Sequence, residues 1–453
     1  MKKKFTLLLL QISLMSYSQC WQSLSAGYGF TLGIKPDGTL WGCGENLDGE
    51  LGDGTFERKY VFVQIGTDND WQQISCGGFH TLALKTNGTL WAWGANEAGQ
   101  LGDGTPVPSG IPSQVGSEND WAKISAGTSM SAAIKTNGTL WMWGANYYGQ
   151  LGDGTETNKY QPTQVSNETD WKSITCAYNK SFGIKNDGKL WAWGENFMGG
   201  LGIGYFPFEV TSPILVEGEN WESISCGANH TLAQKEDGTL WGWGYNDTGA
   251  IGDNTTDPRP TPVPISGTWL SYSASFVSSL GIKDDGKLYT WGSDQSGQLG
   301  DGVADEPPMS PTVISADTDW QMVVGGGEHE FAFKNNGDLW GFGWNFYGQL
   351  GQTDLVNIVY SPIVIDCPMA LKTAEFGFQN RFAIYPNPTA GELNIKSHSN
   401  LDIDVLVVYD FRGMQIFKTN HTEKIDVSDL PTGIYILKIM AQGNVSYQKF
   451  IKK

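Results

Sequence analysis

The sequence has few basic residues and little charge overall. Its 453 residues include 29 Lys and Arg against 48 Asp and Glu, and charged residues make up only 17%. Residues 19–366 hold 16 basic and 40 acidic side chains, a net charge of −24. So acidic a segment repels phosphate, which excludes nucleic acid and anionic membranes as favoured partners. The excess is typical of a solvated surface, with calcium in the acidic loops as the alternative.

Long hydrophobic runs are also missing, apart from one at the beginning. Lys2, Lys3 and Lys4 precede an apolar run over residues 5–15 and then the small residues Ser16 and Ser18. This order predicts a signal peptide over residues 1–18, because the run is too short to span a bilayer. A lipoprotein attached through Cys20 is a weaker alternative, since Gln19 precedes it. We therefore expect Sec export, no transmembrane segment, and a protein that is secreted or attached to the outer-membrane surface.

Glycine and tryptophan are abundant. The chain has 59 Gly and 19 Trp, and Gly alone reaches nearly twice its ordinary share of about 7%. Turns need Gly and pleated surfaces favour aromatic residues. The composition therefore predicts an all-β protein with many short strands.

Seven segments repeat one pattern, and each opens on a tryptophan. A copy reads roughly W-x-x-I-S-x-G, T-L-A-x-K, D/N-G-T-L-W-x-W-G-x-N, x-x-G-Q-L-G-D-G-T and, after a variable loop, P-x-x-V. The D/N-G pair in every copy predicts a two-residue hairpin turn, because both residues tolerate positive φ. Four strands a copy in seven copies predict a seven-bladed β-propeller over residues 19–367. The copies open at Trp21, Trp71, Trp121, Trp171, Trp221, Trp269 and Trp320.

The ends of the repeat region predict how the ring closes. No P-x-x-V segment precedes Trp21, whereas the seventh copy ends with one at residues 362–365. We expect this last strand to complete the first blade. Cys20 and Cys367 flank the repeats and should then lie close enough to form a disulfide that holds the ring together.

Three histidines of the repeats share one register position. They are His80, His230 and His329, five residues before the repeat Lys. Their blades are not consecutive, so a packing or hydrogen-bonding role is favoured over a metal site. The run Glu328-His329-Glu330 is the best candidate for a hydrolase centre, although no nucleophile or paired carboxylate accompanies it.

The repeats resemble those of the regulator of chromosome condensation family. That family shares the G-x-x-H-T-L-A-L, D-G-x-L-W-x-W-G-x-N and G-Q-L-G-D-G runs, and the resemblance covers residues 21–366. It implies a seven-bladed propeller. The nucleotide exchange on a small GTPase known in the family is not expected here, because the chain carries an export signal and no basic tail. Secreted bacterial relatives use the same ring as a protein-binding surface, so the resemblance implies a non-enzymatic binding module.

The tail resembles a second family, the C-terminal sorting domain of type IX secretion cargo. The resemblance rests on Y-P-N-P-T at residues 385–389, G-E-L-N-I at 391–395 and L-P-T-G-I-Y at 430–435. It implies recognition of residues 382–453 by the type IX translocon, with residues 368–381 as a linker. Alternation at Ile403, Val405 and Val407 and over residues 434–438 independently predicts a small immunoglobulin-like β-sandwich.

One face of the ring is the predicted binding site. Strands alternate in direction, so the turn after W-x-x-I-S-x-G and the long loop after W-G-x-N lie on the same face. This face differs among copies and is rich in aromatics, which suit a protein-binding hot spot. The candidate partner-binding residues are Tyr28, Phe79, Tyr147, Tyr148, Tyr178, Phe197, Tyr205, Phe206, Phe208, Phe276, Phe346 and Tyr347.

Three functions fit this reading. The first is recognition of an extracellular protein through the aromatic face, without catalytic residues, resident metal or cofactor. The second is binding of an extracellular polysaccharide, since aromatic rings and carboxylates also suit sugars. The third, a hydrolase centred on Glu328 and His329, has the least support.

Overall fold

The computed structural model describes residues 20–205, 207–303, 308–352, 356–368, 382–397, 403–410, 414–420, 423–441 and 444–453. The chain divides into two compact units, residues 1–369 and 370–453, which are described separately. The predicted signal peptide and residues 369–381 of the predicted linker lie outside the described residues. Among the residues described, no helix has the length and apolar character needed to cross a membrane.

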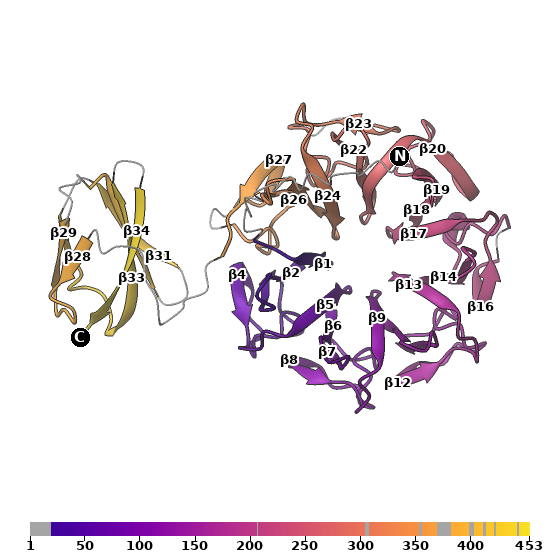
Figure 1. Ribbon diagram of the computed structural model, residues 1–453, viewed down its shortest axis with the longest axis horizontal. Coiled ribbons are helices and arrows are strands. Elements are labelled where there is room, and N and C mark those ends of the chain that lie inside the picture. Colours follow the sequence, from indigo (N-terminus) through magenta and orange to yellow (C-terminus); the bar gives the residue numbers. More distant parts are fainter. Residues whose placement is uncertain are drawn as a thin grey trace, which may run out of the picture. The chain divides into compact units, whose positions relative to one another are not determined.

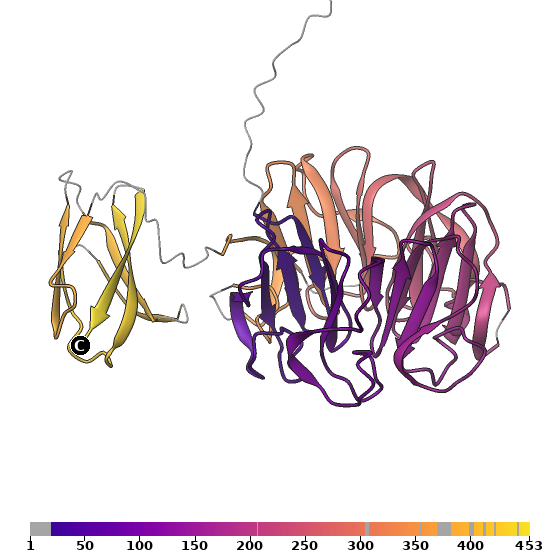
Figure 2. The same cartoon turned by 60° about the horizontal axis from the view of Figure 1, so that its bottom comes forward.

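The first unit is a ring of seven antiparallel β-sheets around a central axis (Figure 1). Figure 2 shows the strands of each sheet crossing the ring from one face to the other. This confirms the predicted seven-bladed propeller. Blades 1 to 3 contain β1 (Ser23–Ala26), β2 (Phe30–Ile34), β3 (Leu40–Gly44) and β4 (Lys59–Ile65); β5 (Trp71–Cys76), β6 (His80–Lys85), β7 (Leu90–Gly94) and β8 (Ser109–Gln114); β9 (Trp121–Ala126), β10 (Met130–Lys135), β11 (Leu140–Gly144) and β12 (Lys159–Gln164).

The remaining blades follow the same order from the axis to the rim. Blade 4 contains β13 (Trp171–Ala177), β14 (Lys180–Lys185), β15 (Leu190–Glu195) and β16 (Glu209–Leu215). Blades 5 and 6 share β20 (Arg259–Ala274), with β17 (Trp221–Cys226), β18 (His230–Lys235) and β19 (Thr239–Gly244) before it and β21 (Ser278–Lys283), β22 (Leu288–Gly292) and β23 (Thr312–Val313) after it. Blade 7 contains β24 (Trp320–Gly325), β25 (His329–Lys334), β26 (Leu339–Trp344) and β27 (Ile358–Ile365).

The D/N-G pairs lie in tight hairpin turns, but the predicted two-residue turn is wrong, because Lys35 N donates to Thr39 O at 3.0 Å around residues 36–38. In blade 1, Gly38 adopts φ 78°, which favours glycine, and its N–H donates to Lys35 O at 2.9 Å. The Asp37 carboxylate accepts hydrogen bonds from the N–H and hydroxyl of Thr39, at 3.1 and 2.6 Å. Such a turn aligns two neighbouring strands closely and sets their register.

The predicted closure of the ring by strand exchange is wrong. The last strand, β27, pairs with β26 of its own blade, and blade 1 is completed by β4. Each copy opens on its innermost strand and holds a full four-stranded meander, so no strand remains to be exchanged. The seam is held instead by the predicted Cys20–Cys367 disulfide, whose Cα atoms lie 5.8 Å apart, and by a hydrogen bond from Gly327 N to Gly27 O of 3.0 Å.

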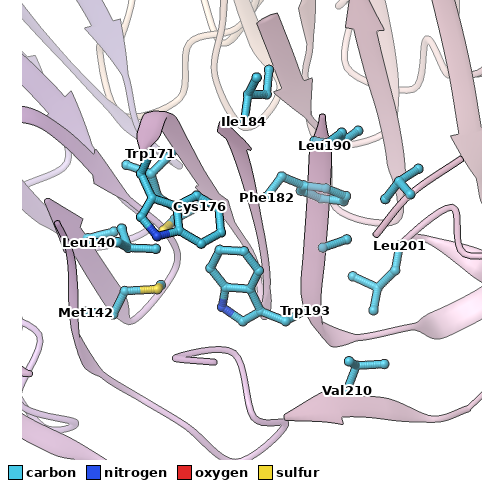
Figure 3. Close-up of a cluster of buried hydrophobic side chains, with 14 of the residues drawn as sticks. Leu140, Met142, Trp171, Cys176, Phe182, Ile184, Leu190, Trp193, Leu201 and Val210 are labelled. Carbon is cyan, nitrogen blue, oxygen red and sulfur yellow. The ribbon is translucent and has the colours of Figure 1, made fainter. Parts of the chain in front are cut away.

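The faces of neighbouring blades pack through large apolar side chains. Figure 3 shows one such layer, where Leu140 and Met142 of blade 3 lie near Trp171 and Trp193 of blade 4. The two indole rings are 5.9 Å apart at an interplanar angle of 65°. Burial of both faces of every sheet explains why these tryptophans recur in the repeat.

The second unit is a small two-sheet structure. One sheet has the order β28 (Phe382–Tyr385), β29 (Glu392–Ser397) and β32 (Lys424–Asp426). The other has the order β31 (Gln415–Asn420), β30 (Val405–Asp410), β33 (Gly433–Ala441) and β34 (Asn444–Lys452). Leu393 and Ile425 of the first sheet share a core with Leu437 and Phe450 of the second, as expected of a β-sandwich.

Replacing both Cys20 and Cys367 by serine should lower the stability of the ring by about 2–5 kcal/mol, because the bond restricts the unfolded chain. Thermal unfolding of the exported chain, with and without a reductant, measures the loss. Cys176→Ser, which removes a buried free thiol, is the control for sensitivity to the reductant. Equal unfolding temperatures for the double variant and the parent would contradict a stabilising bond.

Candidate partner-binding face

Two sets of loops form one face of the ring. The antiparallel order places the short turn between the first and second strands at the same end as the long loop between the third and fourth. Hydrogen bonds join the two sets: Glu45 N donates to Gly29 O at 2.8 Å, and Ala95 N donates to Phe79 O at 2.9 Å. The predicted placement of the aromatic loops on a common face agrees with this geometry.

A buried asparagine organises the long loop in six blades, and Asp294 takes its place in blade 6. In blade 1 the Asn46 side-chain oxygen accepts from Leu51 N at 2.9 Å. Its amide nitrogen donates to the Asp53 carboxylate at 3.1 Å and to Thr55 O at 3.0 Å. Because the side chain is fully buried, these contacts satisfy it and fix the loop at its centre. The residue that follows the asparagine is held at the loop tip.

The aspartates of the G-D-G-T runs are engaged within the loops. Asp53 accepts from Thr55 at 2.7 Å and pairs with the Lys59 ammonium at 3.1 Å. Burial alone would raise the pKa of Asp53, but bonds from Thr55 and Lys59 hold it below its usual range. The described residues contain no group of three or more His, Cys, Asp or Glu side chains placed to hold a metal ion.

Blade 4 departs from this pattern and carries the most aromatic loop. Ile203 stands where five other loops have aspartate and blade 7 has Gln352, and the Asn196 side chain donates to Tyr205 O at 3.0 Å. The short 3₁₀ turn η1 (Phe197–Gly199) follows. In this loop Tyr205 is 51% exposed and Phe208 is 64% exposed. Phe206, another predicted binding residue, lies outside the described residues.

The loop tips carry exposed apolar side chains at one register position, directly after the repeat asparagine. Leu47, Tyr147, Phe197 and Phe346 occupy it in blades 1, 3, 4 and 7, and their exposed fractions are 57%, 64%, 41% and 48%. Blades 2, 5 and 6 have the polar residues Glu97, Asp247 and Gln295 there. An apolar arc therefore follows part of the face, with Glu97 interrupting it in blade 2 and Asp247 and Gln295 standing in blades 5 and 6.

Aromatic side chains also gather where the short turns meet around the central channel. Tyr28 contacts Phe79 and Phe276, with ring centroids 5.9 and 5.5 Å apart, and Phe276 contacts Tyr178 at 5.4 Å. These four residues come from blades 1, 2, 4 and 6 and are half-buried. We call them the mouth cluster.

The predicted binding residues thus fall into two classes. Tyr147, Phe197, Tyr205, Phe208 and Phe346 are exposed at the loop tips. The half-buried ones pack on each other or on neighbours, as Tyr148 does on Phe208 at 5.9 Å. The half-buried set is Tyr28, Phe79, Tyr148, Tyr178, Phe276 and Tyr347.

The sequence reasoning overlooked two residues of this face. Leu47 shares the exposed register position with Tyr147 but was passed over because only aromatic residues were considered. Arg58 lies over the Tyr347 ring at 4.2 Å and occupies part of its surface. A search by register position would have found Leu47, whereas no sequence signal marks Arg58.

The candidate hydrolase residues do not converge. Glu328 lies in a short turn and accepts from the Ser296 hydroxyl at 2.7 Å. His329 is fully buried against blade 1, with Nε2 2.9 Å from the Thr31 hydroxyl. Glu330 is fully buried against blade 6, where Ser278 donates to it at 3.3 Å. Successive strand residues point to opposite sides, so these side chains do not share a site.

The three repeat histidines belong to the contacts between blades. His80 Nε2 lies 2.9 Å from the Ser131 hydroxyl of the next blade, and that hydroxyl donates to Gln100 O at 2.7 Å. The hydroxyl has a single proton, so the histidine nitrogen is the donor. Burial lowers the pKa of His80, His230 and His329 to about 3, which keeps all three neutral.

Comparison with known families agrees with this architecture. The model of the RCC1-like domain matches residues 13–276 and 74–383, and that of the secretion system C-terminal sorting domain matches residues 383–453. The overlapping matches to the first model reflect the internal repeat. No curated protein sequence matches the chain.

Solved propellers share the fold. Human WBSCR16 matches with 21% identity and a TM-score of 0.61, covering 70% of this chain and 87% of that one. Prp20p from Saccharomyces cerevisiae matches with 22% identity and a TM-score of 0.62, covering 68% and 81%. Yeast RCC1 (Prp20), solved with Kap60, matches with 18% identity and a TM-score of 0.65, covering 85% and 91%. At such identities the similarity establishes the fold alone.

The neutral histidines predict a loss of stability in acid. An unfolded histidine takes up a proton near pH 6.5 and the buried one only near pH 3, so stability falls as pH drops through this window. The slope is about 1.4 kcal/mol per pH unit for each histidine. His80→Met with His230→Met should flatten the dependence by two such slopes. Methionine is chosen because Met130 occupies this position in blade 3.

Urea unfolding of the parent and the double variant at pH 7, 6 and 5 measures this difference. The variant also loses two hydrogen bonds, so the quantity compared is the slope and not the stability at one pH. Buried Glu50, whose pKa is raised to about 7 by burial, contributes equally to both proteins. Parallel curves would show that the histidines do not carry the acid sensitivity.

Proposed function

We propose, since the chain belongs to the RCC1-like domain family, that its ring is a recognition module which binds an extracellular protein through the loop face. The C-terminal sorting domain identifies the protein as secreted or attached to the cell surface. Type IX secretion machinery is accordingly its partner during export. The ring would act after export, as a scaffold without catalytic residues or cofactor.

The observation that carries this proposal is the set of exposed apolar loop tips. Large apolar side chains held on rigid loops bury much area on binding and lose little conformational freedom. Tyr147 illustrates this arrangement, because it is 64% exposed while Asn146 beside it is fully buried and bonded. The internal residues of the blades repeat, whereas the tips differ, as expected when a scaffold is adapted to one partner.

Binding of a polysaccharide is the competing function. The indole of Trp344 and the ring of Phe346 lie parallel, with centroids 6.3 Å apart and an interplanar angle of 10°. Stacked rings beside carboxylates also suit sugar rings. A screen of the isolated chain on a glycan array separates this function from protein recognition.

Tyr147→Ala combined with Phe208→Ala should abolish partner binding and leave the unfolding temperature within about 2 °C of the parent. Both side chains are 64% exposed, so truncation removes contact area for a partner and little internal packing. Affinity capture from the native environment, followed by mass spectrometry and competition with untagged chain, measures the binding.

Leu270→Ala is the matched control. Leu270 is 59% exposed and follows Trp269, whose N–H donates to Gly238 O in a D/N-G turn, at the opposite ends of the strands from the loop tips. Capture should survive this change. Equal capture by the parent and the loop-tip variant would contradict binding through this face.

A further inference from the structure

The mouth cluster surrounds the end of a cavity in the central channel. The cavity has a volume of about 130 Å³ and is lined by Tyr28, Tyr178 and Phe276 together with small residues from all seven blades. Several of these are glycines, such as Gly77 and Gly127, so no side chain fills the space. The volume is ample for the head of one long side chain, because a single water requires only about 10–15 Å³ on this scale.

The three lining rings occupy one register position, the seventh residue after the opening tryptophan. Thr128, Ala228 and Gly327 stand there in three other blades. Tyr178 adopts φ 51°, a conformation that non-glycine residues rarely take. Such strain costs on the order of 1–3 kcal/mol and persists only where the surroundings enforce it. The surroundings therefore hold Tyr178 in this conformation at the channel mouth.

Elsewhere in the ring, aromatic side chains are paired with cations. The Lys85 ammonium lies 4.7 Å from the centroids of both Trp71 and Trp91, and Arg58 lies over Tyr347. Among the described residues, no lysine or arginine lies over the mouth cluster in this way. The parts of these rings that border the cavity thus have no cationic partner among the described residues.

A carboxylate accompanies the rings. Glu328 belongs to the short turn of blade 7 and follows Gly327, which lines the cavity and lies against the backbone of Tyr28. Burial first, and then the charge of Glu328, raises the pKa of Tyr28. Its hydrogen-bond donor is the neutral Ser296 hydroxyl. Within the described part of the ring, no basic side chain forms an ion pair with it. Its negative charge is therefore uncompensated locally, on a ring segment that carries a net charge of −24.

We propose that the channel mouth is a cation-binding site which receives the lysine or arginine side chain of the protein partner. The aromatic rings would contact the charged head, and Glu328 would pair with it, while the walls of glycine, alanine and cysteine leave it room. The site rests on the proposed function, since it assigns the chemistry of a partner residue. The partner is accordingly a protein with an exposed basic loop.

Small probes test the site without the partner. The chain is labelled with 3-fluorotyrosine, and the ¹⁹F resonances of Tyr28 and Tyr178 are assigned with the Tyr28→Phe and Tyr178→Phe variants. It is then titrated with the Nα-acetyl methylamides of arginine, lysine and norleucine. We expect saturable shifts of both resonances with the two cationic probes at millimolar concentration, and at least fivefold weaker binding of the neutral probe.

Two variants test the residues. Glu328→Gln and Phe276→Leu should each weaken the cationic probes at least threefold, and Glu328→Gln should also remove most of the dependence on salt. Glu97→Gln, a carboxylate change outside the cavity, is the matched control and should leave the affinity unchanged. The unfolding temperature of each variant verifies folding, and Phe276→Leu provides an independent readout should Glu328→Gln fail to fold.

No shift with either cation, or equal shifts with norleucine, would overturn the cation site. Unchanged affinity in both Glu328→Gln and Phe276→Leu would also overturn it. These outcomes are distinct from failure of the proposed function, because capture of a partner by the loop tips is measured separately. A face that captures a protein while the probes fail to bind would retain the recognition function and refute the cation site.

Discussion

A backbone carbonyl in the long loop of one blade joins that blade to the next. Gln100 O accepts both the Ser131 hydroxyl, at 2.7 Å, and the Trp143 indole N–H, at 2.8 Å. Glu50 O receives the equivalent pair from Thr81 and Trp93, both at 2.9 Å. The loop that presents a binding residue is thus also the loop that holds its neighbour. Binding residues can change only at the tips, because the base of each loop belongs to the packing of the ring.

The division between base and tip accounts for where the blades differ. The position that bears a hydroxyl toward the neighbouring blade keeps its type in six blades, as Thr31 and Ser131 show, whereas the histidine position varies and holds Met130 in blade 3. Blade 7 is the exception at the hydroxyl position, where it has Glu330. The contacting residue of blade 6 is Ser278, which occupies the position of the histidines. The paired change preserves a hydrogen bond of 3.3 Å between the blades. Variation at the tips, by contrast, needs no such compensation and is open to selection for a ligand.

Much of the fold could be predicted from the sequence because its signals are local. The D/N-G turns determine hairpins without reference to distant residues. Because each motif occurs in seven copies, each strand assignment rests on seven independent observations. Ring closure was mispredicted because the order of the motifs does not show whether the last strand of the ring pairs with the third strand of blade 1 or with that of blade 7. The binding face was predicted at the level of loops. Which aromatics would be exposed, as Tyr147 is, and which would pack together, as Tyr28 and Phe276 do, depends on contacts between blades far apart in sequence.

The position of the disulfide at the seam has a consequence for the folding of the ring. Cys20 precedes the first blade and Cys367 follows the last, so their thiols meet only when all seven blades are in place. A chain interrupted within any blade would keep both sulfurs reduced, whatever the state of the blades already folded. The disulfide therefore forms only in a ring that has all seven blades. In an oxidising compartment, complete rings would carry the Cys20–Cys367 disulfide and incomplete chains would carry free thiols. The redox state of these two cysteines would thus distinguish the two forms before any ligand binds.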